Sequence, residues 1–235
     1  MTLLVQTYLL ANGDAGLAHL RDVLGITIRE KDTRVLLKYD QIASPLGDPM
    51  VQECRGLILD RRDWSVLSWP FRKFFNYGEG YAAPIDLSTA VAQEKVDGTC
   101  CTIYRYGGAW RVQTLGMMDA EGNINFGAST FADLFWRMFD QQAKLATSFC
   151  YTFEIATPFN RVVTRYDHER IVLLGARHLP TLMELSQNVL DFISKTIHVE
   201  RPTTYRIASL DDAMRMAREL PTLEEGYVVV DAAFN

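Results

Sequence analysis

The sequence predicts an α+β fold. Runs with strand-like patterns and runs with helical patterns alternate irregularly along the chain, which does not fit a doubly wound parallel sheet. Thr99–Tyr106 and Ala109–Leu115 are strand-like runs separated by two glycines, a pattern typical of an antiparallel hairpin. No internal repeat and no linker rich in proline, glycine or serine divides the chain. Its 235 residues, 48% of them hydrophobic, are enough to bury the core of one large domain or of two small ones.

Two segments are expected to be helical on the evidence of their ends or of their apolar spacing. The first covers residues 14–24 and ends at Gly25, a residue type that often follows a helix. The second covers residues 129–146, where apolar side chains recur at steps of three and four residues. Because this spacing lines one helix face, the aromatic residues on it are expected to pack in the core rather than to stack on bases.

Two further helices are marked by capping patterns. Thr181 with Glu184 predicts a helix that runs to about Lys195, and Ser209 with Asp212 predicts another that ends before the next proline. The remaining strand-like runs are rich in β-branched and aromatic residues. They are Val35–Tyr39, Cys54–Asp60, Val66–Trp69, Tyr151–Ala156, Ile171–Gly175 and Gly226–Val230.

Charge and cysteine content restrict the class of protein. The formal net charge of −5 argues against a protein that only coats nucleic acid, but it allows a local basic cleft. None of the four cysteines forms a C-x-x-C pair, so we expect reduced and mostly buried thiols in a reducing compartment. No apolar stretch is long enough to span a membrane, and the apolar N-terminus lacks a basic region, so the expected location is the cytoplasm.

The segment Glu94-Lys95-Val96-Asp97-Gly98-Thr99 contains Lys95, the residue on which the functional interpretation depends. Taken alone, a lysine before Asp-Gly at the mouth of a hairpin is a common turn. Its interpretation changes because further segments suited to the same chemistry occur in a fixed order around it. They are Glu53-Cys54-Arg55-Gly56, the run from Phe71 to Glu79, the run from Phe153 to Val163, and the run from Glu224 to Val229.

Together these segments resemble the covalent nucleotidyltransferase superfamily, which contains ATP-dependent DNA ligases, RNA ligases and mRNA capping enzymes. The Glu-Cys-Arg-Gly and Lys-Phe-Phe-Asn segments narrow the resemblance to the phage-type ATP-dependent RNA ligases that repair cleaved tRNA. The resemblance runs from about Glu53 to Asp231. It implies a single adenylyltransferase domain over residues 1–235 with an ATP-grasp-like ligase fold, built from antiparallel sheets flanked by helices. Residues 1–50 would form a subregion of undetermined role.

The resemblance makes Lys95 the nucleophile that attacks the α-phosphorus of ATP and then carries AMP. In the family's later steps AMP passes to an RNA 5′-phosphate, and a 3′-hydroxyl displaces it, so one difficult displacement is divided into easier ones. The attacking amine must be neutral, although a free lysine is almost fully protonated at neutral pH. Nearby cations disfavour a further ammonium, and Arg55 and Lys73 are the expected cations and the expected contacts of the triphosphate. An alternative role for Arg55 is a salt bridge at a sheet edge.

Two acidic residues have roles implied by the resemblance. Glu154 matches the position that binds the ribose hydroxyls, and a structural pair with Arg161 is the alternative. Arg161 is expected to hold its loop in place, and a role at the RNA end stays open. Glu225 matches the carboxylate that binds Mg²⁺ (or Mn²⁺), a metal that needs few protein ligands. Because neighbouring strand residues point to opposite faces, only one of Glu224 and Glu225 can face the site, and the position of Gly226 selects Glu225.

Four more residues complete the expected nucleotide site. Phe75 packs near the nucleotide in the family, and ordinary core packing is an equal alternative. The backbone of Glu94 is expected to meet the adenine edge. Asp97 and Gly98 are expected to shape the turn that presents the lysine.

The sequence departs from the family pattern in two places. The family usually carries a basic residue where this chain has Leu115, so either another residue compensates or ATP binding is weaker. The family also carries a Lys-x-Lys motif after Glu-Gly, whereas no lysine follows Lys195 and no C-terminal RNA-specificity domain is present. We therefore expect a fragment of a longer protein that folds and binds ATP but forms the AMP adduct slowly.

The leading hypothesis is an ATP-dependent RNA ligase located in the cytoplasm. If a phage encodes the protein, this is the cytoplasm of the infected bacterium. Its partners would be the ends of tRNA or another structured RNA, together with an end-healing kinase or phosphatase. A DNA ligase or a GTP-using capping enzyme is the nearest alternative, although both usually add an OB-fold domain. A non-catalytic binder of nucleotide or RNA with the same fold is a third, favoured by Leu115 and the missing lysines.

Overall fold

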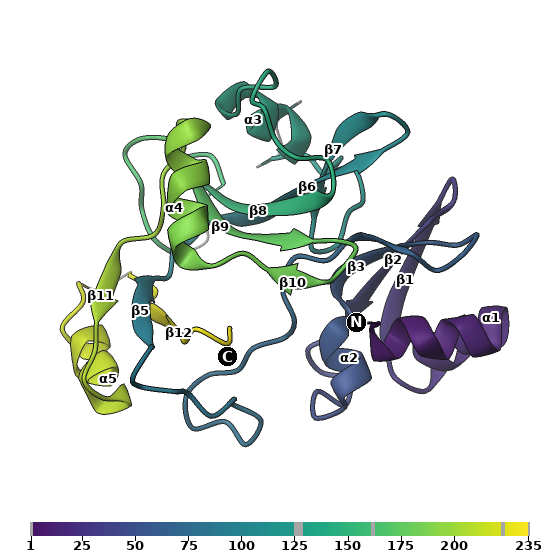
Figure 1. Ribbon diagram of the computed structural model, residues 1–235, viewed down its shortest axis with the longest axis horizontal. Coiled ribbons are helices and arrows are strands. Elements are labelled where there is room, and N and C mark those ends of the chain that lie inside the picture. The colour runs from purple at the N-terminus through teal and green to yellow at the C-terminus, as the bar shows by residue number, and fades with distance from the viewer. Residues whose placement is uncertain (1, 125–128, 161–162, 222–223, 235) are drawn as a thin grey trace.

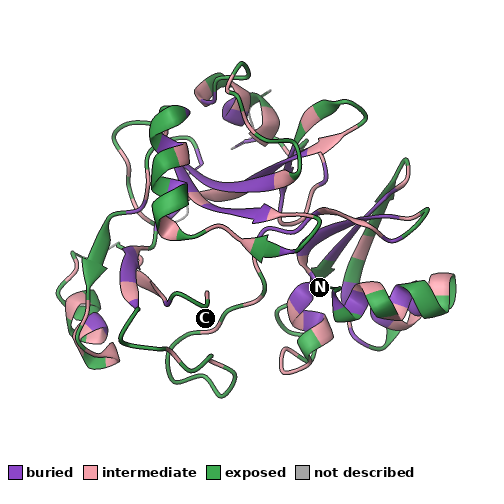
Figure 2. Ribbon diagram, viewed as in Figure 1, coloured by how far each residue is buried: buried purple, intermediate pink, exposed green. Residues whose placement is uncertain are grey.

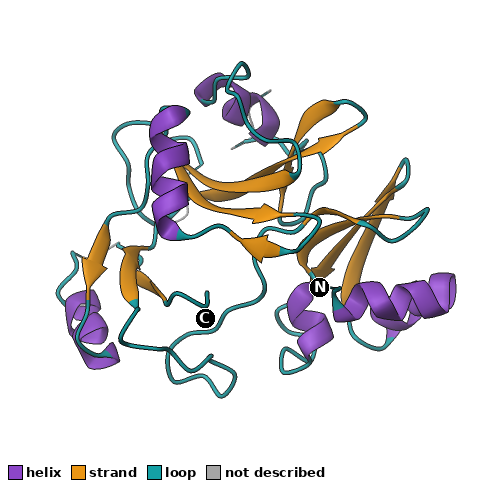
Figure 3. Cartoon of the chain, in the orientation of Figure 1, coloured by secondary structure: helices purple, strands orange, loops and turns teal. Residues whose placement is uncertain are grey.

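The computed structural model describes residues 2–124, 129–160, 163–221 and 224–234. Within these residues the chain forms three antiparallel sheets with helices packed around them (Figure 1). Strands predominate in the middle of the molecule, and the helices lie outside them (Figure 3). This arrangement confirms the α+β class and the antiparallel sheets flanked by helices that the sequence predicts.

The N-terminal sheet has the strand order β1-β2-β3-β4. Its strands are β1 (Ile26–Lys31), β2 (Arg34–Tyr39), β3 (Arg55–Asp60) and β4 (Val66–Ser68). Helices α1 (Leu4–Asp22) and α2 (Pro49–Glu53) pack against it (Figure 1). Leu9 and Leu20 of α1 are fully buried against Leu37 and Leu57 of the sheet, so this sheet has its own apolar core.

The central sheet has the strand order β10-β9-β8-β6-β7. Its strands are β6 (Thr99–Tyr106), β7 (Ala109–Thr114), β8 (Phe149–Ala156), β9 (Arg170–His178) and β10 (Met183–Glu184). Helices α3 (Phe131–Met138) and α4 (Gln187–Thr196) cover it, and its middle strands are the most deeply buried (Figure 2). Phe135, Phe139 and Phe153 pack with ring centroids 5.3–5.4 Å apart, which confirms that the aromatic face of α3 belongs to the core.

The third sheet is small and has the strand order β11-β5-β12. Its strands are β5 (Val91–Glu94), β11 (Thr204–Arg206) and β12 (Tyr227–Val230), and α5 (Leu210–Arg218) lies beside it. It occupies the left of Figure 1, away from the N-terminal sheet. Because β5 ends just before Lys95 and β12 begins just after Gly226, this sheet brings two distant parts of the chain together.

Helix α1 begins at Leu4, ten residues before the predicted start, and is kinked at Gly13, where φ is 51°. Its first backbone N–H groups donate to the carboxylate of Glu53, at 3.1 Å from Leu4 and 2.9 Å from Val5. A helix start is easiest to predict when its cap is adjacent in sequence, and here the cap lies about fifty residues away. The cap of α5 by Ser209 is local, and that helix was predicted from it.

Two predicted helices are shorter than expected. The helix over 129–146 ends at Met138, because Phe139 is extended and the carboxylate of Asp140 accepts from the Gln142 amide in a turn of its own. The helix expected from 181 begins at Gln187. The two side chains that were expected to cap it have other partners, since Thr181 contacts His178 and Glu184 forms an ion pair with Arg177.

Most of the strands were predicted from the sequence, and some were not. The hairpin of β6 and β7 and the strands β2, β3, β4, β8, β9 and β12 appear close to their predicted bounds, whereas β1, β5, β10, β11 and α2 were not predicted. All four cysteines are free thiols, and three of them are buried, as expected. No helix in the described part of the chain has the length and apolar character needed to cross a membrane.

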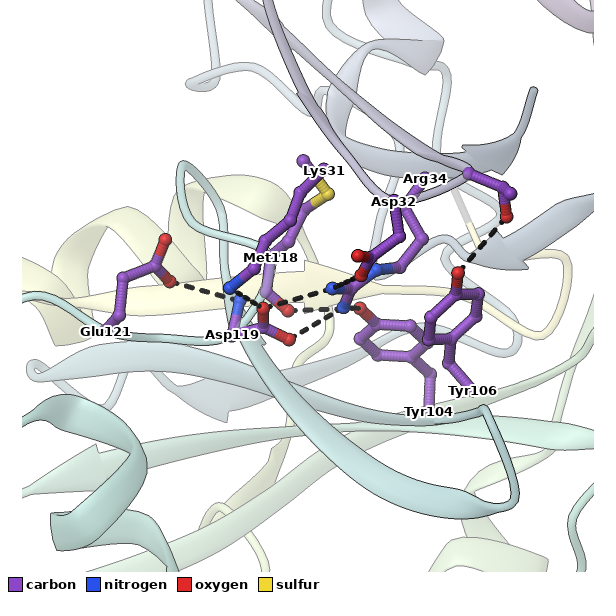
Figure 4. A network of polar contacts seen from close by, with 9 residues as sticks. Lys31, Asp32, Arg34, Tyr104, Tyr106, Met118, Asp119 and Glu121 are labelled. Carbon is purple, nitrogen blue, oxygen red and sulfur yellow. Dashed lines mark hydrogen bonds and ion pairs between the residues drawn. The ribbon is translucent and has the colours of Figure 1, made fainter.

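A polar network joins the N-terminal sheet to the central sheet (Figure 4). The buried Arg34 of β2 donates to both carboxylate oxygens of Asp119, at 2.7 and 3.1 Å, and to the hydroxyl of Tyr104 at 2.9 Å. Lys31 also binds Asp119, and Asp32 accepts a further bond from Arg34. The network therefore fixes the position of β2 relative to β6, and β2 lies beside β3, on which Arg55 stands.

We expect Asp119→Asn to lower the free energy of unfolding by about 2 kcal/mol, because it leaves the buried guanidinium without its main counter-charge. Asp32→Asn is the matched control: its carboxylate also binds Arg34 but is 57% exposed, so its loss should cost less than about 0.5 kcal/mol. Urea denaturation of both variants measures the difference. Equal effects of the two substitutions would show that Asp119 does not carry the junction.

Candidate active site

Lys95 and Glu225 meet at the end of the β5–β12 ladder. Glu94 lies opposite Tyr227, and one step further the amide of Lys95 donates to the carbonyl of Gly226 at 3.0 Å. This pairing carries Glu225 to the side of Lys95, where the ammonium and the carboxylate form an ion pair. The two residues are 130 positions apart in sequence. Residues 224–226 precede β12 rather than belonging to it, so the ladder, and not strand alternation, places Glu225. Both Glu224 and Glu225 line the cavity beside Lys95, so the expectation that only one of them faces the site is wrong.

Glu154 lies on β8 opposite Cys100 of β6 and is only 9% exposed. Burial raises the pKa of Glu154 to about 8, with Asp97 adding to this rise, while the positive charges of Arg55 and Lys95 oppose it. At neutral pH the unliganded chain therefore holds Glu154 as a neutral carboxylic acid, able to donate as well as to accept. Arg55, Lys95 and Asp97 are therefore close enough to Glu154 for their charges to affect its pKa.

The raised pKa of Glu154 predicts how stability changes with pH. The ordinary pKa of a glutamate is near 4.5, and the folded value is about 8, so the folded chain keeps a proton that the unfolded chain releases. The stabilisation from this proton is complete below pH 4.5 and is lost as the pH rises to about 8, on the order of 1 kcal/mol per pH unit.

We therefore expect Glu154→Gln, a neutral side chain of similar shape, to reduce the fall in stability between about pH 5 and 8. The measurement is the free energy of unfolding of wild type and variant at several pH values, and Glu79→Gln at an exposed position is the control. A Glu154→Gln variant that keeps the wild-type slope would contradict this account of the site.

Arg55 and Lys73 lie against aromatic rings and form no ion pair with a carboxylate among the described residues, and Lys73 also donates to the carbonyl of Phe74 at 2.9 Å. The Arg55 guanidinium lies 4.9 Å from the centroid of the Phe74 ring, and the Lys73 amine lies 4.5 Å from that of Phe75. Burial lowers the pKa of Lys73, and the charge of Arg55 lowers it further, while Glu79 opposes the shift. Nη1 of Arg55 is buried and has no hydrogen-bond partner among the described residues. Such a buried donor is costly unless a ligand satisfies it.

Asp97 and Gly98 fix the backbone that follows the lysine. The buried carboxylate of Asp97 accepts from the amides of Val163 and Thr164 at 2.6 and 2.5 Å, and its own amide donates to the Tyr166 hydroxyl. Gly98 lies directly against β8: a Cβ on it would overlap the carbonyl oxygen of Ile155 and lie 2.9 Å from the carbonyl carbon. The turn therefore requires an anion acceptor at 97 and no side chain at 98.

The side chain of Glu94 forms a structural ion pair with Arg170. Its carboxylate pairs with Arg170 at 2.7 Å and accepts from Thr203 at 3.2 Å, and this pairing lowers its pKa although burial alone would raise it. A backbone role at the adenine edge remains a prediction. Arg161, for which a loop role and an RNA role were considered, lies outside the described residues.

A cavity of about 460 Å³ opens beside Lys95 and Glu225. Three tyrosines that the sequence analysis did not single out line it: Tyr166, Tyr205 and Tyr227. Tyr205 and Tyr227 pack edge to face, with centroids 5.4 Å apart. They come from β11 and β12, and the pairing of both strands with β5 brings them together. Tyr227 follows Glu225 and Gly226 in a predicted motif, whereas nothing in the local sequence of Tyr205 indicates a binding surface.

The structure thus arranges the predicted residues as a connected series. Phe75 contacts Lys73, Lys73 is influenced by Arg55, Arg55 and Lys95 act on Glu154, and Lys95 pairs with Glu225. Phe75 also packs against Tyr81, at 5.6 Å between centroids. Glu94, Lys95 and Glu225 line the cavity, whereas Arg55, Lys73 and Glu154 are not among its lining residues.

A family model described as RNA ligase matches residues 53–234. The chain belongs to this RNA ligase family. It is 35% identical over 161 residues to an RNA ligase of Rhodothermus phage RM378, a match that covers 53% of this chain and 36% of the relative. It is 31% identical over 252 aligned residues to a putative bifunctional polynucleotide kinase/RNA ligase of Autographa californica nuclear polyhedrosis virus, covering 95% of this chain and 34% of the relative.

Solved structures agree with this membership at the level of the fold. An archaeal ATP-dependent RNA ligase superposes with a TM-score of 0.63 and 16% identity, covering 98% of this chain and 61% of that one. A putative ATP-dependent DNA ligase from Aquifex aeolicus superposes with a TM-score of 0.57 and 14% identity, covering 88% of this chain and 54% of that one. The chain spans about a third of the length of the two viral relatives above.

Proposed function

We propose that this chain is the adenylyltransferase domain of an ATP-dependent RNA ligase that joins 5′-phosphate and 3′-hydroxyl RNA ends. One observation carries the proposal: the amine of Lys95 and the carboxylate of Glu225 meet across 130 residues, and the charges of Lys95 and Arg55 both act on the buried Glu154. Family membership supports the reaction class, because the family model covers the lysine, both acidic residues and the cations.

In the first step the ammonium of Lys95, which pairs with Glu225, gives up a proton to solvent, and the resulting neutral amine attacks the α-phosphorus of ATP. A nitrogen–phosphorus bond forms, the bond to the oxygen that bridges the α- and β-phosphates breaks, and pyrophosphate leaves with that oxygen. The proton that the attacking nitrogen carries passes to solvent through the cavity beside Lys95. Arg55 and Lys73 would stabilise the charge that develops on the leaving group, and the unsatisfied Nη1 of Arg55 supports this assignment.

The remaining groups would position the nucleotide. Glu154, neutral in the unliganded chain, can both accept from and donate to the ribose hydroxyls. Glu224 and Glu225 line the cavity, and one or two carboxylates are what Mg²⁺ or Mn²⁺ usually takes from a protein. A metal held there would supply positive charge for the phosphate oxygens.

In the second step an RNA 5′-phosphate oxygen would attack the phosphorus of the AMP group, and Lys95 would be released. In the third step a 3′-hydroxyl would attack that 5′-phosphate, form the new phosphodiester and release AMP. The RNA would be a tRNA or another structured RNA. The relative that carries a kinase in the same polypeptide supports the idea that an end-healing enzyme acts with the ligase.

The test separates sealing from activation. The chain is incubated with Mg²⁺ and an RNA that carries a 3′-hydroxyl and either a 5′-phosphate, with ATP present, or a ready-made 5′-adenylyl group, without ATP. We expect sealing of both, and faster sealing of the adenylylated RNA because the slow first step is bypassed. Sealing of nicked DNA alone, or labelling by GTP alone, would favour the DNA ligase or the capping enzyme. Bound ATP without label or sealing would favour a non-catalytic binder.

A further inference from the structure

The turn that ends β7 lies beside a lysine of the N-terminal sheet. Residues 114–117 form this turn, which is closed by the amide of Thr114 donating to the carbonyl of Met117 at 2.9 Å. It contains Leu115, at the position where the family usually has a basic residue. The amine of Lys38 reaches the same turn, because a Cβ placed on Gly116 would lie 3.6 Å from Nζ of Lys38.

Lys38 is also the direct cross-strand neighbour of Arg55. The β2–β3 ladder pairs Leu37 with Leu57 and then Lys38 with Arg55, so Gly56 forms a bulge and has a φ of +75°. Side chains that are directly opposite in an antiparallel pair point to the same face of the sheet. Lys38 and Arg55 therefore present their charges together.

The backbone of Leu115 covers the bulge. A Cβ on Gly56 would lie 3.0 Å from the Cα of Leu115, and Nε2 of the buried Gln113 donates to the Gly56 carbonyl at 2.7 Å. The turn at 115 is thus fixed against the strand that carries Arg55. Lys38 approaches this turn from the neighbouring strand, which brings a cation to the part of the site that lacks one on its own strand.

The charges of this pair are not neutralised within the described chain. Lys38 is exposed and has no hydrogen bond or ion pair with the described residues, although its charge contributes to the lowered pKa of Asp40, which arises mainly from the backbone amides of Ala43 and Ile42. Arg55 retains a buried, unsatisfied Nη1. Like charges directly opposite each other destabilise a sheet, so an anionic ligand would relieve a cost that the folded chain otherwise bears.

We propose that Lys38 supplies the cation that Leu115 does not, and that it binds the β- or γ-phosphate of the nucleoside triphosphate together with Arg55. This inference rests on the proposed function, since it assumes that the site takes a triphosphate. It also extends the role of the N-terminal sheet in substrate binding from β3, which carries Arg55, to β2, which carries Lys38 and is held in place by the Arg34 network.

The test compares nucleotides that differ only in the phosphates Lys38 would contact. Affinities of the full chain for AMP and for an ATP analogue with a methylene α,β-bridge are measured by calorimetry, so that no transfer consumes the ligand. We expect Lys38→Ala to lower the affinity for the analogue about tenfold, as for a lost charged hydrogen bond. The affinity for AMP should stay within about twofold of the wild-type value. Lys144→Ala, an exposed lysine far along the chain, is the matched control and should change neither affinity. Thermal unfolding verifies that each variant is folded.

A double variant tests whether a lysine at position 115 can replace Lys38. Adding Leu115→Lys to Lys38→Ala should restore most of the lost affinity for the analogue, because the cation returns at the family's usual position. Equal losses for AMP and the analogue, or no loss for either, would overturn the inference about Lys38 while leaving the proposed function intact. A wild-type chain that fails to bind the analogue at all would overturn both.

Discussion

Replacing Lys95 with alanine is expected to reduce the covalent labelling of the chain with α-labelled ATP about 10³-fold or more. Lys95 is the lysine that the β5–β12 ladder places against Glu225, and an alanine has no atom that can form the bond to phosphorus. Because its side chain is 44% exposed, the substitution leaves no cavity in a core and the fold should persist. Label that survives a denaturing gel is the measurement.

Two controls define the result. Lys144→Ala removes an exposed lysine elsewhere and should label like wild type. Affinity for the methylene-bridged ATP analogue should stay within about tenfold of wild type in Lys95→Ala, because the nucleotide contacts assigned to Arg55, Lys73 and Glu154 are intact. Undiminished label in Lys95→Ala would show that another residue is the nucleophile.

Gly98→Ala is expected to destabilise the chain by about 3 kcal/mol and to abolish labelling in the same variant. The added Cβ would overlap the carbonyl oxygen of Ile155, which is backbone in the middle of the central sheet and cannot rotate away. Relief requires the turn after Lys95 to move off β8, and that movement shifts the lysine. Chemical denaturation and covalent labelling of the same preparation measure both effects.

Gly80→Ala is the matched control, because a Cβ at that position meets nothing within 4 Å. We expect it to change stability by less than about 0.5 kcal/mol and to label normally. A Gly98→Ala variant with wild-type stability and labelling would contradict the close approach of the lysine turn to β8.

The features that the sequence predicted are those whose cause is local. The glycine turn of the β6–β7 hairpin, the Ser209 cap of α5 and the apolar face of α3 each depend on residues within a few positions. The start of α1 depends on a distant partner, because Glu53 caps it from 48 residues away, and no local pattern carries that information. The start of α4 was misplaced for another reason: Thr181 and Glu184 contact His178 and Arg177, three and seven positions back, instead of capping a helix.

The same division applies to the site. Ordered motifs were enough to name Arg55, Lys73, Lys95, Glu154 and Glu225, and the structure brings these residues into one connected series. Lys38, Tyr166 and Tyr205 lie in no motif, and Tyr227 lies in one without having been assigned a role. They become visible only when the sheet register and the β11-β5-β12 order are known. The raised pKa of Glu154 likewise comes from burial in the folded chain rather than from its neighbours in sequence.

The most direct test of the central claim is the mass of the intact chain after long incubation with saturating ATP and Mg²⁺, followed by peptide mapping. We predict one added AMP group per chain, located on Lys95 and removed by added pyrophosphate, with none formed from GTP. Absence of an adduct after long incubation, or an adduct located on any other residue, would contradict the claim that Lys95 is the nucleophile.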